Sequence, residues 1–140
     1  MFQDLDSIIE MLRGFYNELP PHVATPTDEN HVRAYLQGCF DDGSLVYVLK
    51  THGLALGVIF QDWMSPAMLC ADLAFFLLPE CRGRLGLADD LYQEFEDRAR
   101  SAGVAQIIMT NQHPDFEIAA DRFYRSRGLH AVGRTYQKEL

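Results

Sequence analysis

Apolar residues recur at helical spacing in two segments near the start of the chain, which predicts two amphipathic helices. The first helix is expected over residues 4–17 and ends before Pro20-Pro21. The second is expected over residues 27–40, because a threonine followed by two acidic residues is typical of a helix start. The apolar faces consist of Leu5, Ile8, Ile9, Leu12, Phe15 and Tyr16, and of Val32, Tyr35, Leu36, Cys39 and Phe40.

Strands and helices alternate through the rest of the chain. Apolar runs rich in β-branched and aromatic residues predict strands, with a hairpin at His52-Gly53. Strands are expected at residues 45–51, 54–61, 68–78 and 104–110, and helices at 87–102 and 114–128. Residues 129–132 and 135–138 predict either a last strand or a broken pair of strands.

The predicted order is therefore ααβββαβαβ. Strand–helix alternation in the second half favours an α/β (α+β) fold with a mixed sheet covered by helices. A chain of 140 residues without repeats or linkers is expected to form a single domain over residues 1–140.

Charge and cysteine content exclude several classes of protein. The formal net charge is −8 and the sequence pI is near 4.9, which argues against a nucleic-acid partner because phosphate contacts need a basic surface. No apolar run is long enough for a membrane span, and the acidic N-terminus lacks the basic region of a signal peptide. The three cysteines form no C-x-x-C, and no spacing typical of a metal site occurs, so a reduced cytoplasmic protein without metal is expected.

The segment from Pro79 to Ala88 joins a predicted strand to a predicted helix and is rich in glycine and arginine. Backbone N–H groups at a helix start, with the positive end of the helix dipole behind them, form a cradle for anions. Gly83 and Gly86 permit close backbone approach, and Arg82 and Arg84 add positive charge. The segment fits neither a Walker loop nor a dinucleotide fingerprint. A phosphate-bearing ligand and a plain strand-to-helix turn both remain open from these residues alone.

The order of elements and this loop together resemble the GNAT superfamily of N-acetyltransferases, which bind acetyl-CoA. The family signature is Q/R-x-x-G-x-G/A, and Gly86-Leu87-Ala88 matches its G-x-G/A part, while the segment from Pro79 to Gly83 resembles the P-E-x-R-G lead-in. Arg82 lies one residue further upstream than the signature places it. The resemblance implies that the pyrophosphate of acetyl-CoA lies on this loop. The residues implied are Arg82, Gly83, Arg84, Leu85, Gly86, Leu87 and Ala88.

A second stretch, from Ala120 to Leu129, resembles the family pattern A-x-x-F-Y-x-x-x-G-F. In the family the tyrosine of this pattern often protonates the departing CoA thiolate, which would make Tyr124 the general acid. A phenol is protonated at neutral pH and can donate to a thiolate. The alternative is that Tyr124 is a half-buried aromatic residue on a helix.

A third match lies in the predicted strand over residues 68–78. Asp72 is the only charged residue between Asp62 and Glu80, and the resemblance implies that it is a general base. Burial would raise the pKa of this carboxyl group toward that use, whereas an edge position facing water is the alternative. By the same resemblance, backbone groups of Phe76, Leu77 and Leu78 would hold the pantetheine of acetyl-CoA.

The resemblance implies transfer of an acetyl group from acetyl-CoA to an amine-bearing small molecule or protein. Residues 1–70 contain nine acidic and three basic residues, which favours a cationic acceptor such as a polyamine, an aminoglycoside or a lysine side chain. The family's first strand is missing, because the chain starts with a predicted helix. The sheet edge is then open to a partner protein or a second copy, so the alternative function is a catalytically inactive GNAT-fold module that binds other proteins.

Overall fold

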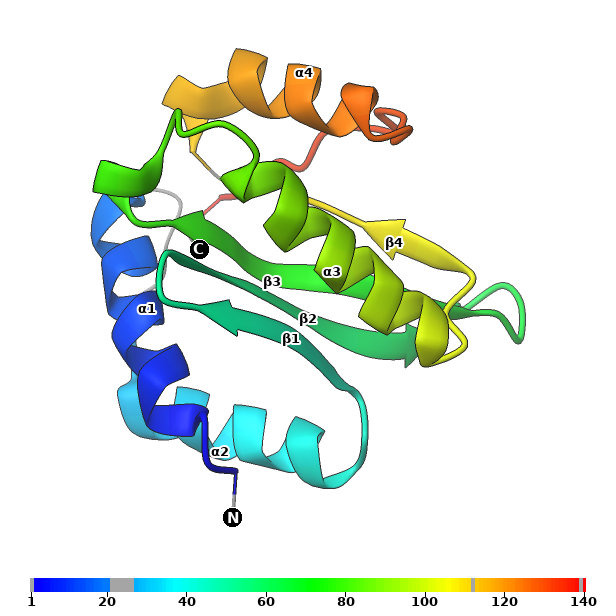
Figure 1. The fold of residues 1–140 in the computed structure, drawn as a ribbon. Helices are drawn as coiled ribbons and strands as arrows, with labels where there is room; N and C mark the ends of the chain where they lie inside the picture. Colours follow the sequence, from blue (N-terminus) through cyan, green and yellow to red (C-terminus); the bar gives the residue numbers. More distant parts are fainter. Residues whose placement is uncertain (1, 21–26, 112, 139) are drawn as a thin grey trace.

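The computed structural model describes residues 2–20, 27–111, 113–138 and 140, and Figure 1 shows their arrangement. The described residues form helices and strands in the predicted order as far as the last predicted helix, and the predicted mixed α/β class is confirmed. The elements are α1 (Leu5–Glu18), α2 (Glu29–Asp41), β1 (Leu45–Lys50), β2 (Gly53–Gln61), β3 (Met68–Leu77), α3 (Leu87–Ser101), β4 (Gln106–Ile108) and α4 (Glu117–Ser126). Every helix in this part of the chain is too short or too polar to span a lipid bilayer.

The strands form one sheet in the order β1-β2-β3-β4 (Figure 1). β1, β2 and β3 are antiparallel neighbours, whereas β4 runs parallel to β3 because α3 crosses back between them. The two parallel strands pair only where Leu69–Ala71 meets Gln106–Ile108. β3 continues to Leu77, so its C-terminal half has a neighbour on one side only among the described residues.

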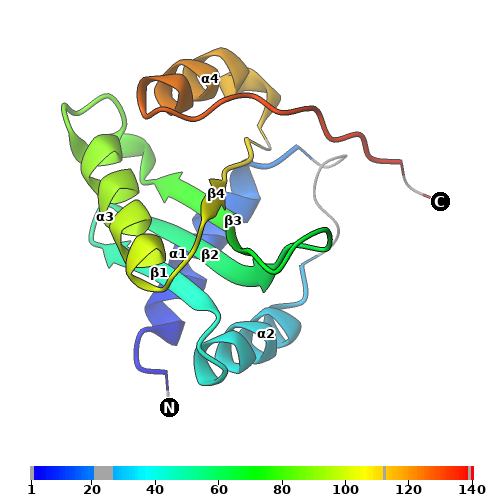
Figure 2. The same ribbon diagram turned by 90° about the vertical axis from the view of Figure 1, so that its right-hand side faces the viewer.

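Helices cover both faces of the sheet (Figures 1 and 2). Leu54 and Leu56 of β2 pack against α1 and α2, whereas Ala55 between them packs against α3, as expected for side chains that alternate along a strand. α3 lies close to the sheet at Gly57, where an added Cβ would lie only 2.7 Å from Cζ of Phe95. A glycine at this position therefore permits the contact between α3 and β2.

The outer edge of β1 has no neighbouring strand in the described part of the chain. α1 is the first regular element there, in agreement with the predicted order. Part of this edge is covered by a side chain, because Arg98 of α3 donates a hydrogen bond to the backbone carbonyl of Tyr47.

The predicted last strand, or broken pair, at residues 129–132 and 135–138 is wrong. Residues 129–138 form no regular structure, and the side chains of Val132 and Tyr136 are 93% and 85% exposed. A strand needs a neighbour that pairs with its backbone, and β4 covers only Gln106–Ile108 rather than the predicted residues 104–110. Leu129 is half-buried, but the other apolar positions that suggested a strand are exposed.

Candidate active site

β3 and β4 separate at Asp72, and this separation exposes one edge of β3 over its C-terminal half. Leu56 of β2 pairs with Ala74, and the next residue, Gly57, pairs with Asp72, so Leu73 is an extra residue on β3. Such a β-bulge bends a strand and increases its twist. The bulge lies where the parallel pairing with β4 stops, and it accounts for the opening between the two strands.

Backbone groups on this half of β3 point alternately to β2 and to the open edge. The N–H group of Leu78 donates to the carbonyl of His52 at 2.9 Å. The backbone N–H and C=O groups of successive residues in an antiparallel strand point to opposite sides. Those of Phe76 therefore also point to β2, whereas those of Phe75 and Leu77 point to the open edge. Of the three strand residues predicted from the sequence, only Leu77 presents its backbone to this edge. Phe75 was missed, because the pairing register between β2 and β3 sets the alternation and leaves no direct signal in the sequence.

The Asp72 carboxylate lies at the start of the opening. Its Oδ1 atom accepts a hydrogen bond from the backbone N–H group of Thr110, just beyond β4, at 3.0 Å. Burial raises the pKa of Asp72 to about 7, although the hydrogen bond from Thr110 acts in the opposite direction. A carboxyl group with this pKa is half ionised near neutral pH, which suits a group that must take up a proton.

Tyr124 reaches the same place from α4. Its ring contacts Phe75 of β3 at a centroid distance of 6.5 Å in an edge-on arrangement. Burial, followed by the negative charge of Asp72, raises the pKa of Tyr124 well above its usual value. The phenol is therefore protonated at neutral pH, and it is close enough to Asp72 for the two groups to interact electrostatically. In the described part of the chain the hydroxyl group has no hydrogen-bond partner.

The loop before α3 presents backbone N–H groups without acceptors. Gly83 and Gly86 have φ angles of +78° and +83°, a left-handed conformation that favours glycine. α3 starts directly after Gly86 and has no side-chain cap, so its first turn leaves donors unsatisfied. The N–H groups for which the described residues supply no acceptor belong to Gly83, Leu85, Gly86, Ala88 and Asp89. Unsatisfied amides at a helix start are what the predicted anion cradle requires, and its binding of an anion stays a prediction.

The two arginines of the loop differ in their surroundings. Arg82 pairs with Glu18 of α1 at 2.5 Å, and its Nε–H group donates to the carbonyl of Leu77 at 3.0 Å. Its guanidinium group also lies 5.4 Å from the ring centre of Phe76. Arg84 is exposed, and no described residue forms an ion pair with it. Arg82 therefore ties α1 to the end of β3, and Arg84 is the arginine directed to solvent.

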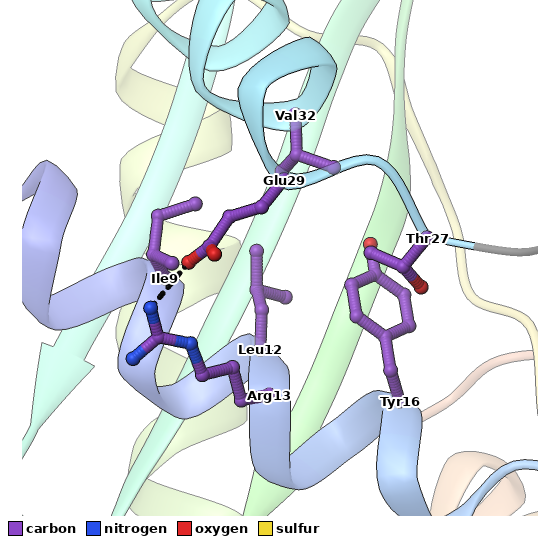
Figure 3. A pocket seen from close by; sticks show the side chains of 7 residues that line it. All are labelled: Ile9, Leu12, Arg13, Tyr16, Thr27, Glu29 and Val32. Carbon is purple, nitrogen blue, oxygen red and sulfur yellow. Dashed lines mark hydrogen bonds and ion pairs between the residues drawn. The ribbon is translucent and has the colours of Figure 1, made fainter.

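A pocket of about 240 Å³ lies between α1 and α2 (Figure 3). Leu12, Tyr16 and Val32 contribute to its wall together with Arg13 and Glu29. The Arg13 and Glu29 side chains form an ion pair of 2.5 Å with each other. None of the predicted site residues lines this pocket, and its two charged lining residues neutralise each other.

Comparison with solved structures finds this arrangement of elements in acetyltransferases. An acetyltransferase from Trypanosoma brucei covers 98% of this chain and 93% of its own, with a TM-score of 0.66 and 19% identity. A predicted acetyltransferase from Clostridium acetobutylicum, solved with acetyl-CoA, covers 98% and 90%, with a TM-score of 0.73 and 11% identity. An aminoglycoside acetyltransferase from an uncultured soil metagenomic sample, solved with sisomicin, covers 98% and 89%, with a TM-score of 0.68 and 16% identity. No protein-family model matches the chain, and no curated protein matches its sequence.

These matches establish the fold: the chain has the fold of GNAT-type acetyltransferases over nearly its whole length. The resemblance predicted from the sequence is therefore confirmed at the level of fold. Within that fold, the structure brings Asp72 and Tyr124 to the open edge of β3, and several amides of the glycine loop have no acceptor among the described residues.

Proposed function

We propose that this protein transfers an acetyl group from acetyl-CoA to a primary amine. The observation that supports this proposal most strongly is the grouping at one opening of the sheet. A carboxyl group with a pKa near 7, Asp72, and a protonated phenol, Tyr124, lie beside the unpaired edge of β3. The similarity of the fold to acetyltransferases supports the same reaction class.

The protein offers groups that suit each part of acetyl-CoA as a substrate. The N–H groups of Gly83, Leu85, Gly86 and Ala88, which have no acceptor among the described residues, suit the diphosphate together with the exposed Arg84. The edge groups of Phe75 and the N–H group of Leu77 suit the amide groups of pantetheine, which would lie along β3 as an added strand does, whereas the carbonyl of Leu77 already accepts from Arg82. Arg82 would then hold the loop in place through its ion pair with Glu18 instead of contacting phosphate.

The proposed chemistry is direct attack of the amine on the thioester. Asp72 takes a proton from the ammonium form of the acceptor, and the neutral amine attacks the thioester carbonyl carbon. The C–N bond forms and the C–S bond breaks, while backbone N–H groups of β3 stabilise the negative charge on the oxygen. Tyr124 donates its proton to the departing thiolate, giving free CoA. As the C–S bond breaks, the nitrogen of the new amide releases its remaining extra proton to solvent. The proton held by Asp72 passes through solvent to the phenolate, which restores both groups.

The acceptor in this proposal is a cationic small-molecule amine. The first 70 residues, which form α1, α2 and the hairpin of β1 and β2, carry nine acidic and three basic residues. A surface with this balance attracts cations over several ångströms at physiological salt. A soil metagenomic enzyme of the same fold was solved with sisomicin, an aminoglycoside, which supports a polyamine-like or aminoglycoside-like acceptor.

Two measurements test the proposal. Acetyl-CoA at millimolar concentration should raise the melting temperature, because a ligand that binds only the folded state stabilises it. Incubation of the protein with acetyl-CoA and a mixed library of amines should add one acetyl group to at least one amine, detected by mass spectrometry. If neither a shift nor an acetylated product appears, the acetyltransferase proposal is wrong and a protein-binding role becomes the better account.

Tyr136→Phe provides a matched control for Tyr124→Phe. Tyr136 is 85% exposed and lies outside the regular elements, so its loss should not change turnover. Loss of the Tyr124 hydroxyl should slow turnover while acetyl-CoA binding persists. Equal turnover for the two variants would show that Tyr124 is not the acid.

A further inference from the structure

α4 carries Tyr124, yet none of its residues is fully buried, and Phe123 and Tyr124 are half-buried. In Figure 1 this helix, coloured orange, lies above β3 and α3. Aromatic contacts attach its inner face: Phe123 lies 5.9 Å from Phe75 of β3 and 6.1 Å from Tyr92 of α3, as ring-centre distances. The chain that follows α4 forms no regular structure, and it contacts α4 through an exposed ion pair of 3.8 Å between Arg134 and Glu117. A helix attached over so small an area needs a further contact to fix the direction of its side chains.

That contact is an ion pair between the ends of two helices. Arg127, directly after α4, places Nη2 against Oδ1 of Asp89 in the first turn of α3. The Arg127 side chain is 24% exposed, less than most arginines that form ion pairs in this protein. Its guanidinium group also lies 5.9 Å from the ring centre of Phe123. Each charge suits its place, because a cation is favourable at a helix C-terminus and an anion at a helix N-terminus.

The backbone links Arg127 rigidly to Tyr124. The N–H groups of Arg127 and Leu129 both donate to the carbonyl of Tyr124 at 3.0 Å, and Gly128 closes the helix with a φ of +85°. Residues three positions apart lie on the same side of a helix. A displacement of Arg127 therefore displaces the phenol of Tyr124 as well.

The same pair changes the charge beside the glycine loop. The Asp89 carboxylate belongs to the turn of α3 whose amides suit a diphosphate, and by itself it would repel one. Arg127 supplies an opposite charge in direct contact with it. The Nε atom of Arg127 is buried and has no hydrogen-bond partner among the described residues.

We propose that Arg127 is a positioning residue of the acetyltransferase site. Through Asp89 it fixes the end of α4 to the start of α3, which holds Tyr124 at the open edge of β3, and it cancels the Asp89 charge next to the diphosphate. This inference rests on the proposed function. Arg127 occupies an unspecified position in the sequence pattern that contains Tyr124, so the pattern did not identify it.

Three variants separate the two effects of Arg127. Arg127→Gln should lower kcat about tenfold through misplacement of Tyr124, and it should raise the Kd for acetyl-CoA about three- to tenfold because Asp89 is left uncompensated. Asp89→Asn should lower kcat by a similar factor without raising this Kd. The double variant should have the kcat of either single variant and a Kd close to that of the unmodified protein. Additive losses in kcat, or a raised Kd in the double variant, would contradict the proposal.

Introducing Arg127→Gln into a protein that already carries Tyr124→Phe tests whether Arg127 acts through Tyr124. In that background Arg127→Gln should cause no further loss of kcat, while the rise in Kd should persist. Arg125→Gln is the matched control, because Arg125 also lies on α4 but pairs with Asp121 of the same helix at 2.9 Å. We expect this variant to leave both constants unchanged. A full tenfold loss added to the Tyr124→Phe effect would show that Arg127 acts by another route.

Hydrogen exchange tests the link without any activity. Backbone amides of α4 should exchange about tenfold faster in Arg127→Gln than in Arg125→Gln, because the first variant alone releases the end of the helix. If α4 is protected equally in both variants, the positioning role is wrong even when the protein is an acetyltransferase. If α4 loses protection but acetyl-CoA neither binds nor reacts, the link is present and the proposed function is wrong, so its catalytic role is wrong with it.

Discussion

Comparing the free energy of unfolding of the protein and its Asp72→Asn variant shows how much the folded state disfavours ionisation of this carboxyl group. Asparagine has nearly the same shape and keeps an oxygen atom that can accept the hydrogen bond from Thr110, which is 3.0 Å long. The substitution therefore removes the charge and leaves the contact. Burial raises the pKa of Asp72 from 3.8 to about 7 in the folded protein. Between these two pH values the folded state holds a proton that the unfolded state has released.

The sign and size of the effect follow from this difference in proton binding. Because the folded state binds more protons in this window, its free energy of unfolding falls as the pH rises from about 4 to about 7 and stays lower above that range. A shift of about three pH units at about 1.4 kcal/mol each corresponds to about 4 kcal/mol. The free energy of unfolding of Asp72→Asn does not fall in this way, because asparagine does not ionise. We therefore expect this variant to be more stable than the unmodified protein by up to about 4 kcal/mol at pH 8.

The experiment is urea denaturation of both proteins from pH 5.5 to pH 8.5. The lower limit stays above the sequence pI of 4.9, where low net charge promotes precipitation. Far-UV circular dichroism is the suitable signal, because Trp63 is 89% exposed and its fluorescence should change little on unfolding. The stability difference should grow by about 2 kcal/mol between pH 5.5 and pH 7 and then remain constant. A difference that does not depend on pH would refute a raised pKa for Asp72.

The same variant should be a poor enzyme. Without a carboxylate at this position, transfer to the amine should slow by about 10²-fold or more at pH 8, measured as release of CoA with saturating acetyl-CoA. Greater stability together with lower activity would show that the protein retains a destabilising charge at this position for its chemistry. Unchanged activity would show that another group takes the proton from the amine.

Three other substitutions test separate parts of the site. Tyr124→Phe should lower kcat about 10²-fold with little change in KM for acetyl-CoA in steady-state kinetics, since only the leaving thiolate loses its proton donor; a changed KM with unchanged kcat would contradict this. Gly86→Ala should destabilise the protein by about 1–2 kcal/mol in thermal or urea unfolding, because its φ of +83° is strained for any side chain. It should also weaken acetyl-CoA binding in calorimetry, and unchanged stability and affinity would argue against the left-handed loop. Arg82→Ala should lower the melting temperature through loss of the pair with Glu18 while acetyl-CoA affinity persists; a large loss of affinity would show that Arg82 contacts the diphosphate.

Local features of the chain were sufficient to predict most of the fold. The apolar spacing of α1 and α2 lies within single helices, and Gly83 and Gly86 favour the left-handed backbone that they adopt. Such signals act between residues a few positions apart, so they can be interpreted without knowledge of distant contacts. The resulting order of elements, together with the glycine loop before α3, was enough to suggest the GNAT fold.

Contacts between distant segments decided the rest. The sequence could not show that β4 is short or that residues 129–138 lack a partner, because pairing depends on where two strands separate in space. The register of β3 with β2, together with the short β4, determines that Phe75 and Leu77 face an open edge. Sequence analysis proposed Asp72 and Tyr124 by resemblance, but burial in the folded protein raises the pKa of both groups, and the charge of Asp72 raises the pKa of Tyr124 further. The ion pair between Asp89 and Arg127 likewise exists only because folding brings the end of α4 to the start of α3.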